Sequence, residues 1–399
     1  MSTDVTATTP SWWEVFQAFL KLGFTSFGGP VAHLGYFRDE FVTRRQWLSD
    51  AAYADLVALC QFLPGPASSQ VGFSLGLLRG GWLGALMAWL AFTLPSALLL
   101  ILLAMSAGWF GGSVGQGILH GLKLVAVAVV AQAVWGMARS LCPDRERATI
   151  AVLAVALVIL LPSAIGQIGA IIAGGLIGLR VCRSLPPSAQ STLLIPVSRP
   201  VALICLALFA AGLVALPLWA AAAGNAGLQL FDVFYRAGAL VFGGGHVVLP
   251  LLETGLVTPG WMSADQFLAG YGLTQAMPGP LFTFSAYLGY VTEPGGWSVA
   301  LLCLVAIFVP GFLLLVGALP FWGALRQTPV AQSAMAGANA AVVGILGAAL
   351  YDPVWTSAVQ SRGDFAIALA AFVLLIVWKL APWKVVVLTA LAGALSTLA

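Results

Sequence analysis

The sequence predicts an all-α integral membrane protein built from two inverted-topology repeats. Its 399 residues are 60% hydrophobic and 8% charged, and the mean hydropathy is +0.99. Apolar runs long enough to span a bilayer recur along the chain, as in proteins that cross a membrane several times. A broken apolar segment also occurs twice, at 61–66 and 275–280, and the second copy begins 214 positions after the first (275 − 61).

Each copy of this segment contains a Pro-Gly-Pro motif, formed by Pro64, Gly65 and Pro66 and again by Pro278, Gly279 and Pro280. Proline cannot donate the helical hydrogen bond and glycine weakens a helix, so each motif predicts the end of one helix and the start of another. In lipid, the freed backbone groups must be covered by protein or line a wet cavity. A broken helix in both halves of a membrane protein therefore indicates a transport site.

The first half is expected to contain two broken or re-entrant segments followed by four spans. A polar stretch, 1–10, precedes an apolar run that is interrupted by Gly28-Gly29-Pro30, and an amphipathic connector follows. The apolar run lies at 15–34, the connector at 36–50, the halves around the first Pro-Gly-Pro at 51–63 and 67–78, and the spans at about 82–106, 116–138, 148–161 and 164–181.

A linker rich in proline and serine, 183–199, and an additional apolar segment, about 201–219, separate the halves. The second half repeats the order of the first. Its elements are 230–250, the connector 251–266, the short halves 267–277 and 281–291, and spans at about 297–319, 331–351, 365–379 and 384–399. We therefore divide the chain into a first membrane repeat (1–182), a linker with a connecting transmembrane helix (183–224) and a second, inverted repeat (225–399).

Residue types match between the halves at an offset of 214 or 215 positions. The matched pairs include Gly23/Gly238, Gly28/Gly243, Gly29/Gly244, Trp47/Trp261, Ser49/Ser263 and Pro95/Pro310. Chance does not place so many glycines, prolines and tryptophans in register, so the halves are expected to share one structure.

The placement of arginine predicts that the halves face opposite sides of the membrane. The connector of the first half carries Arg38, Arg44 and Arg45, whereas the equivalent connector of the second half carries Glu253 and Asp265. Loops rich in arginine are expected on the cytoplasmic side, which makes the repeat inverted. Between nine and thirteen crossings fit this pattern, because re-entrant and spanning segments have similar hydropathy.

One basic residue lies inside the first apolar run of each half. Lys21 aligns with Arg236, at an offset of 215 (236 − 21), and each comes shortly before its Gly-Gly break. A basic residue there costs on the order of 2.5–3.5 kcal/mol on insertion scales, so it should face protein or water. We interpret the pair as anion-binding residues; the alternative is that both snorkel to an interface. Lys123 is expected to snorkel.

The Pro-Gly-Pro breaks predict a second set of anion ligands. Pro66 and Pro280 suit the first position of a helix, whose N–H groups are unpaired and attract an anion. Hydroxyls at Ser69 and Thr283, amides at Gln61 and Gln275, and the backbone at Gly28, Gly29, Gly243 and Gly244 complete the candidate site. A break that serves packing alone is the alternative.

Several other classes of function are disfavoured by the sequence. The five cysteines are scattered, no lysine follows a glycine as in a Walker A loop, and no metal-ligand spacing, nucleophile motif or chain of buried carboxylates is present. The net charge of +3 indicates no nucleic-acid patch. His33 and His246 follow the two breaks but are not aligned, which favours polar contacts over a proton relay. We expect neither an enzyme nor a cofactor.

The motifs resemble those of the chromate ion transporter family. The similar segments are 19–30, Trp47-Leu48-Ser49, 60–66 and their copies in the second half, so the chain resembles the long, fused form of the family. Shorter members carry one half each and work as oppositely oriented pairs. The resemblance implies a multi-pass protein of the bacterial inner membrane that exports chromate from the cytoplasm and confers chromate resistance.

The resemblance leaves the substrate and the mechanism open. The partners it implies are the lipid bilayer and chromate or a related oxyanion such as sulfate. Uniport, proton-coupled transport and anion exchange are all compatible with it. A homodimer is compatible with it as well. A membrane scaffold or lipid-handling protein is a more remote alternative, because that class needs no matched basic residues in both halves.

Overall fold

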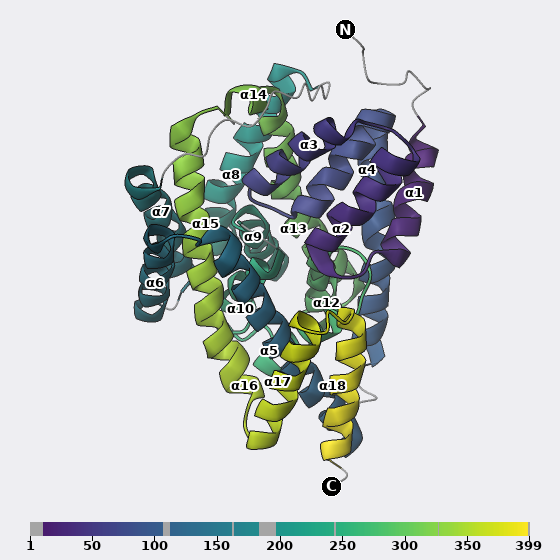
Figure 1. The fold of residues 1–399 in the computed structure, drawn as a ribbon, viewed down its shortest axis with the longest axis vertical. Coiled ribbons are helices and arrows are strands. Elements are labelled where there is room, and N and C mark those ends of the chain that lie inside the picture. The colour runs from purple at the N-terminus through teal and green to yellow at the C-terminus, as the bar shows by residue number, and fades with distance from the viewer. Residues whose placement is uncertain are drawn as a thin grey trace.

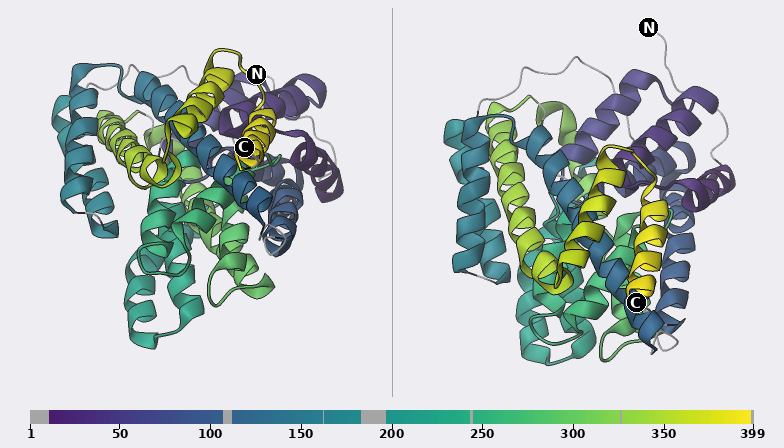
Figure 2. Two further views of the ribbon diagram at one scale, coloured as in Figure 1. Left: turned by 90° about the horizontal axis from the view of Figure 1, so that it is seen from below. Right: turned by 60° about the horizontal axis from the view of Figure 1, so that its bottom comes forward.

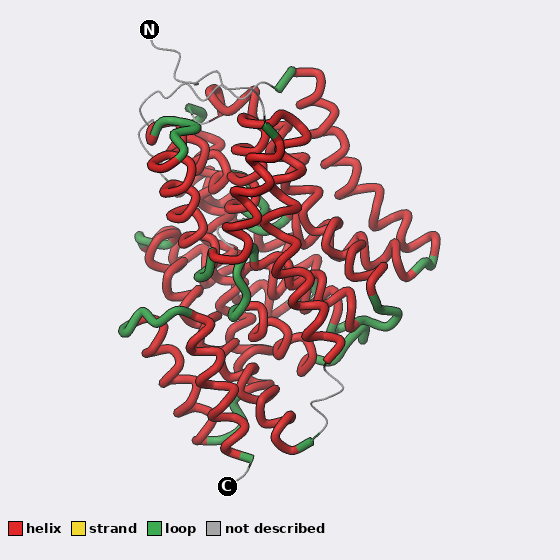
Figure 3. The backbone as a smooth tube through the Cα atoms, turned by 90° about the vertical axis from the view of Figure 1, so that its right-hand side faces the viewer, coloured by secondary structure: helices red, strands yellow, loops and turns green. Residues whose placement is uncertain are grey.

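The computed structural model describes residues 11–106, 112–161, 163–182, 197–242, 245–325 and 327–397. Within these ranges the chain is helical and has no strand, as Figure 3 shows. In Figure 1 the first described helix lies in the upper half of the molecule and the last one in the lower half. The prediction of an all-α membrane protein is therefore confirmed.

The helices of the first half follow the predicted order. They are α1 (Trp12–Thr25), α2 (Gly29–Phe37), the π-helix η1 (Arg38–Arg44), α3 (Asp50–Phe62), α4 (Ala67–Met105), α5 (Ser113–Leu141), α6 (Arg145–Leu160) and α7 (Ala164–Val181). Within α4, Gly80 and Gly81 have non-helical backbone angles, so two helices meet there. The helix α8 (Arg199–Ala223) leads to the second half.

The second half is helical as well. They are α9 (Ala226–Ala239), η3 (Gly245–Val247), α10 (Val248–Leu256), α11 (Ala264–Thr274), η4 (Leu281–Thr283), α12 (Phe284–Val291), α13 (Trp297–Ala318), η5 (Leu319–Phe321), α14 (Trp322–Leu325), α15 (Pro329–Ala349), η6 (Leu350–Trp355), α16 (Thr356–Ala358), α17 (Arg362–Ile376) and α18 (Pro382–Ser396).

Aligned serines cap the helices that precede the two Pro-Gly-Pro motifs. The Ser49 hydroxyl accepts a hydrogen bond of 3.3 Å from the Ala52 N–H at the start of α3. The Ser263 hydroxyl accepts one of 3.2 Å from the Gln266 N–H at the start of α11. Each cap satisfies a backbone donor that has no partner within its helix.

Five helical stretches of the described chain are long and apolar enough to cross a membrane. They are 67–105, 113–141, 199–223, 297–325 and 329–358. The helix α8 exposes most of its side chains, as expected of a helix that faces lipid. The helices α6, α7, α17 and α18 are shorter; the 15 residues of α18 extend about 22 Å, against about 30 Å of bilayer hydrocarbon.

The last two helices of each half pack against the long helix of the other half. The helix α5 contacts α17 and α18, and α15 contacts α6 and α7 (Figures 1 and 2). Glycines allow both approaches: a Cβ on Gly121 would meet the backbone of Thr389, and a Cβ on Gly337 would meet the backbone of Gly174 and Gly178. The two halves are therefore interlocked by equivalent contacts.

Candidate functional site

The two Pro-Gly-Pro corners each contact the opposite half of the chain. The Gly65 N–H donates a hydrogen bond of 2.7 Å to the Val241 carbonyl, and the Gly279 N–H donates one of 2.9 Å to the Ser26 carbonyl. Val241 and Ser26 follow α9 and α1 and are aligned, since 241 − 26 = 215. Each corner therefore lies against the end of the first helix of the other half.

Both corner glycines have backbone angles that favour glycine, with φ of +125° at Gly65 and +89° at Gly279. A Cβ on Gly65 would lie 2.8 Å from Gln70 Nε2, and a Cβ on Gly279 would lie 3.0 Å from Ser96 Oγ. The buried Gln70 amide donates to the carbonyls of Pro64 (3.1 Å) and Gly311 (2.9 Å). Protein atoms therefore surround the first corner closely.

A cavity of about 450 Å³ lies beside the second corner. The start of α2, the C-terminal part of α5, η3 and the end of α11 form its walls. Its polar and glycine positions include Gly28, Gly29, Gln132, His246, Gln275 and Gly279. No aspartate, glutamate, lysine or arginine is among the described residues that line it.

The start of α2 opens onto this cavity. Gly28 and Gly29 have φ of +101° and +79°, and a Cβ built on Gly29 meets nothing within 4 Å. Pro30 occupies the first turn, where the backbone donors have no partner within the helix. This wall therefore offers backbone N–H groups and the positive end of a helix dipole to an anion.

Gln275 supplies a free amide at the same place. Its Nε2 is buried and has no hydrogen-bond partner in the described structure, and the residue is one of those that line the cavity. A buried amide without a partner costs on the order of 1–3 kcal/mol. A ligand that accepts a hydrogen bond there would remove that cost.

The structure brings four of the predicted site residues to the cavity wall: Gly28, Gly29, Gln275 and Gly279. Those that do not line it are Lys21, Arg236, Gln61, Pro64, Gly65, Pro66, Ser69, Pro278, Pro280 and Thr283. Gly243 and Gly244 lie outside the described residues. Gln132, which belongs to no sequence motif, and His246, for which a polar contact is expected, also line the cavity.

The two aligned basic residues each have an acidic neighbour. Lys21 Nζ lies 3.7 Å from Glu40 Oε2, and its side chain is 55% exposed. Arg236 donates hydrogen bonds of 3.0 and 2.6 Å to the two carboxylate oxygens of Asp232, one turn earlier on α9. Asp232 therefore compensates the charge of Arg236, whereas Lys21 shares the single charge of Glu40 with Arg44 and Arg45.

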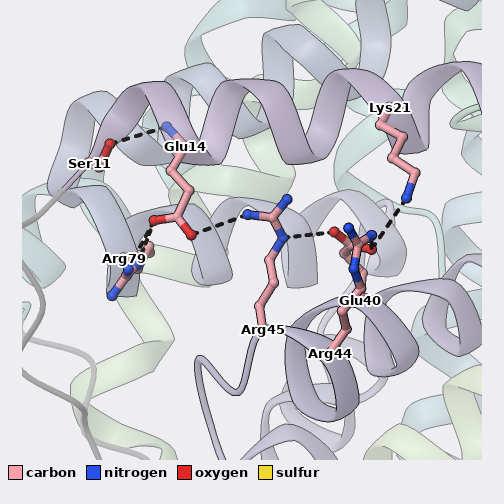
Figure 4. A network of polar contacts seen from close by, with 7 residues as sticks. All are labelled: Ser11, Glu14, Lys21, Glu40, Arg44, Arg45 and Arg79. Carbon is pink, nitrogen blue, oxygen red and sulfur yellow. Dashed lines mark hydrogen bonds and ion pairs between the residues drawn. The ribbon is translucent and has the colours of Figure 1, made fainter.

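Lys21 belongs to a network of charged residues that joins α1 to η1 and α4 (Figure 4). Glu40 accepts hydrogen bonds of 2.8 Å from Arg44 and 2.7 Å from Arg45, while Glu14 pairs with Arg45 and Arg79. Burial raises the pKa of the Glu40 carboxyl, but the Arg45 hydrogen bond and the charges of Arg45, Lys21 and Arg44 outweigh it, and the net pKa is lowered.

Two polar contacts join the N-terminal part of α5 to the second half. His120 Nε2 lies 2.7 Å from Asp364 Oδ1 at the start of α17, and Lys123 Nζ lies 2.9 Å from Asp265 Oδ1 at the start of α11. Lys123, for which snorkelling is expected from the sequence, is thus buried and pairs with an exposed carboxylate. Its counterpart in the second half, Asn339, is neutral (339 − 123 = 216).

Comparison with known proteins identifies the family. The chromate transporter family model matches residues 13–179 and 228–394. The "probable chromate transport protein" of Synechococcus elongatus is 30% identical over 391 residues, covering 95% of this chain and 94% of that protein. The chromate transport protein of Pseudomonas aeruginosa is 30% identical over 358 residues, covering 88% of this chain and 83% of its own length.

A further relative is the chromate transport protein of Cupriavidus metallidurans, which is 28% identical over 373 residues, 92% of this chain and 88% of that protein. No solved structure matches the chain. The family model covers both halves, as the fused two-repeat form requires. The chain belongs to the chromate transporter family.

Proposed function

We propose that this protein is a secondary transporter that exports chromate from the cytoplasm across the bacterial inner membrane and so confers chromate resistance. The observation that carries the proposal is the cavity beside Gly279, where α2 begins and where the Gln275 amide lacks a partner. It is supported by the family to which the chain belongs.

The chemistry of the cavity suits a tetrahedral oxyanion. Chromate offers four oxygens that accept hydrogen bonds, and the walls present amides, a histidine and the start of a helix. Because none of the described lining residues carries a permanent charge, binding depends on hydrogen bonds and the helix dipole. Such a site can release the ion, which transport requires.

The proposed movement is an exchange between two equivalent arrangements of the halves. The reciprocal hydrogen bonds of Gly65 and Gly279, and the reciprocal packing of α5 and α15, support an inverted repeat with a two-fold axis near the corners. In the alternative arrangement, Gln61 and Gly65 would take the places that Gln275 and Gly279 hold at the cavity.

The present arrangement corresponds to the loading state. The cavity lies along the part of α5 that leads to Arg139, and arginine-rich ends are expected in the cytoplasm. The Lys123–Asp265 and His120–Asp364 contacts join α5 to the second half at its other end. They close the outer side while chromate enters from the cytoplasm.

Export needs no ATP or cofactor. Moving two negative charges outward across a membrane that is negative inside by about 100 mV releases roughly 4.6 kcal/mol. That free energy sustains a concentration ratio of more than about three decades.

Uptake of radiolabelled chromate into everted membrane vesicles tests the proposal. We expect accumulation that depends on the protein and on the membrane potential, with competition by sulfate and molybdate measured in parallel. Accumulation no greater than in vesicles without the protein would contradict it. Preferential accumulation of sulfate would assign the same machinery to another oxyanion.

A further inference from the structure

The cavity holds one histidine as its single titratable side chain among the described lining residues. That residue is His246 of η3. A dianion that enters a site without permanent positive charge leaves its own charge largely uncompensated. A side chain that can take up a proton at this place would change the charge of the site.

The surroundings of His246 fix one ring nitrogen and leave the other to the cavity. Nδ1 lies 2.6 Å from the Tyr271 hydroxyl, and Tyr271 is fully buried on α11. The histidine itself is partly exposed and lines the cavity, so Nε2 is the nitrogen available to a ligand. The tyrosine hydroxyl can accept a hydrogen bond from a protonated ring or donate one to a neutral ring.

Few other charged side chains lie on the elements that surround His246. The elements packed against η3 are α10, α15 and η4, and Glu253, two turns further along α10, is their only acidic or basic residue. On α11, besides Tyr271, Asp265 is engaged with Lys123. No ion pair involving His246 is present in the described structure, so neither charge state is imposed by a neighbour.

The position is not duplicated in the first half. His246 aligns with Val31 (246 − 31 = 215). His33, the nearby histidine of the first half, is buried with its Nδ1 3.4 Å from the Ser68 hydroxyl and does not line the cavity. A histidine therefore lines the cavity in the present arrangement of the halves, and the exchanged arrangement has no equivalent histidine.

We propose that His246 binds a proton together with the oxyanion. The protonated ring donates its Nε2–H to an anion oxygen and its Nδ1–H to the Tyr271 hydroxyl. The proton comes from water on the loading side and returns to water on the release side. One net negative charge then crosses with each dianion, half of the charge that chromate alone would carry, and the membrane potential still favours its export. This proposal rests on the oxyanion transport proposed above.

Chromate uptake into everted vesicles tests it, at about pH 6 and about pH 8, since the lower pH favours protonation of the ring. The probe is chromate alone, and the quantity is its half-saturating concentration. Chromate itself takes up a proton near neutral pH, which changes uptake by every variant alike. The test is therefore the difference in pH response between the variants and the wild type. His246→Gln keeps a hydrogen-bonding group next to Tyr271, and His33→Gln serves as the matched control.

At about pH 6 we expect the half-saturating concentration to rise roughly tenfold in His246→Gln, in line with the loss of one charge-assisted hydrogen bond. At about pH 8 the variant and the wild type should agree, and His33→Gln should follow the wild type at both pH values. Folding of each variant is checked by the amount of monodisperse protein. Tyr271→Phe removes the partner of Nδ1, so the half-saturating concentration of this variant should also depend less on pH than that of the wild type.

An unchanged response to pH in His246→Gln would overturn the inference, as would an equal loss in His33→Gln. The two proposals fail separately. Wild-type vesicles that accumulate no chromate contradict the transport function, whereas active vesicles whose response to pH survives in His246→Gln contradict only the role of the histidine.

Discussion

The backbone N–H of Gly65 donates a hydrogen bond of 2.7 Å to the carbonyl of Val241, on the opposite half of the chain. The aligned residues Gly279 and Ser26 make the same contact in the other direction, at 2.9 Å. A pair of reciprocal contacts between aligned residues is what a two-fold relationship between the halves requires. Both corners thus join the halves, and the second corner also lines the cavity through Gly279.

Alanine at position 65 should destabilise the protein through crowding as well as backbone strain. Its Cβ would lie 2.8 Å from Gln70 Nε2 and 3.1 Å from Gly311 Cα. Gly81→Ala is the matched control, because Gly81 has φ of +61° but open space around its Cβ. Backbone strain alone costs on the order of 1–3 kcal/mol. Thermal unfolding in detergent should show a larger loss for Gly65→Ala; equal losses would contradict the packing role.

Replacement of Arg236 by glutamine should lower the amount of folded protein. It leaves the carboxylate of Asp232, whose side chain is 6% exposed, without its partner. The double variant Asp232→Asn/Arg236→Gln should restore folding. If the restored protein also regains chromate uptake, Arg236 serves the fold; if it folds and remains inactive, the predicted anion-binding role of Arg236 gains support. The same two quantities, the amount of folded protein and chromate uptake, are measured for Lys21→Gln, the aligned substitution in the first half.

Linking α5 to α11 should stop transport. Cysteines at positions 123 and 265, in a version free of other cysteines, can be joined by a bifunctional thiol reagent, since Lys123 Nζ and Asp265 Oδ1 are 2.9 Å apart. Uptake should fall to background in the treated double variant and persist in each treated single variant. Full activity after cross-linking would show that this contact does not open during the cycle.

The network around Glu40 predicts a loss of stability in acid. The folded protein holds the pKa of Glu40 below its ordinary value of 4.5, so its contribution is complete above that value and is lost as the pH falls through the lower folded pKa. The midpoint of thermal unfolding should therefore decrease below about pH 4.5. The unfolding midpoint of Glu40→Gln should be a few degrees lower than that of the wild type at neutral pH, and it should decrease less on acidification.

The sequence predicted the elements around the first corner closely, because proline and glycine end helices locally. The expected halves 51–63 and 67–78 correspond to α3 and to the first part of α4, which ends at Gly80. The serines that match between the halves, Ser49 and Ser263, cap α3 and α11. Such features depend on neighbouring residues alone.

The site was harder to predict, because its asymmetry is a property of the conformation. Gln61 and Gln275 are equivalent in the sequence, yet Gln275 lines the cavity and Gln61 is exposed. The partner of Lys21, Glu40, lies on another helix, so the matched charges alone did not reveal their compensation. His246 gains its place from contacts with α11 that no local pattern encodes.

The half-saturating chromate concentration of Gln275→Leu and Gln61→Leu, measured from the cytoplasmic side in everted vesicles at matched protein levels, tests the site most directly. Loss of one amide donor at the cavity should raise the value for Gln275→Leu by about tenfold. Gln61→Leu, at the equivalent but exposed position, should load chromate as the wild type does. Unchanged values in Gln275→Leu, or equal increases in both variants, would contradict binding of chromate in this cavity.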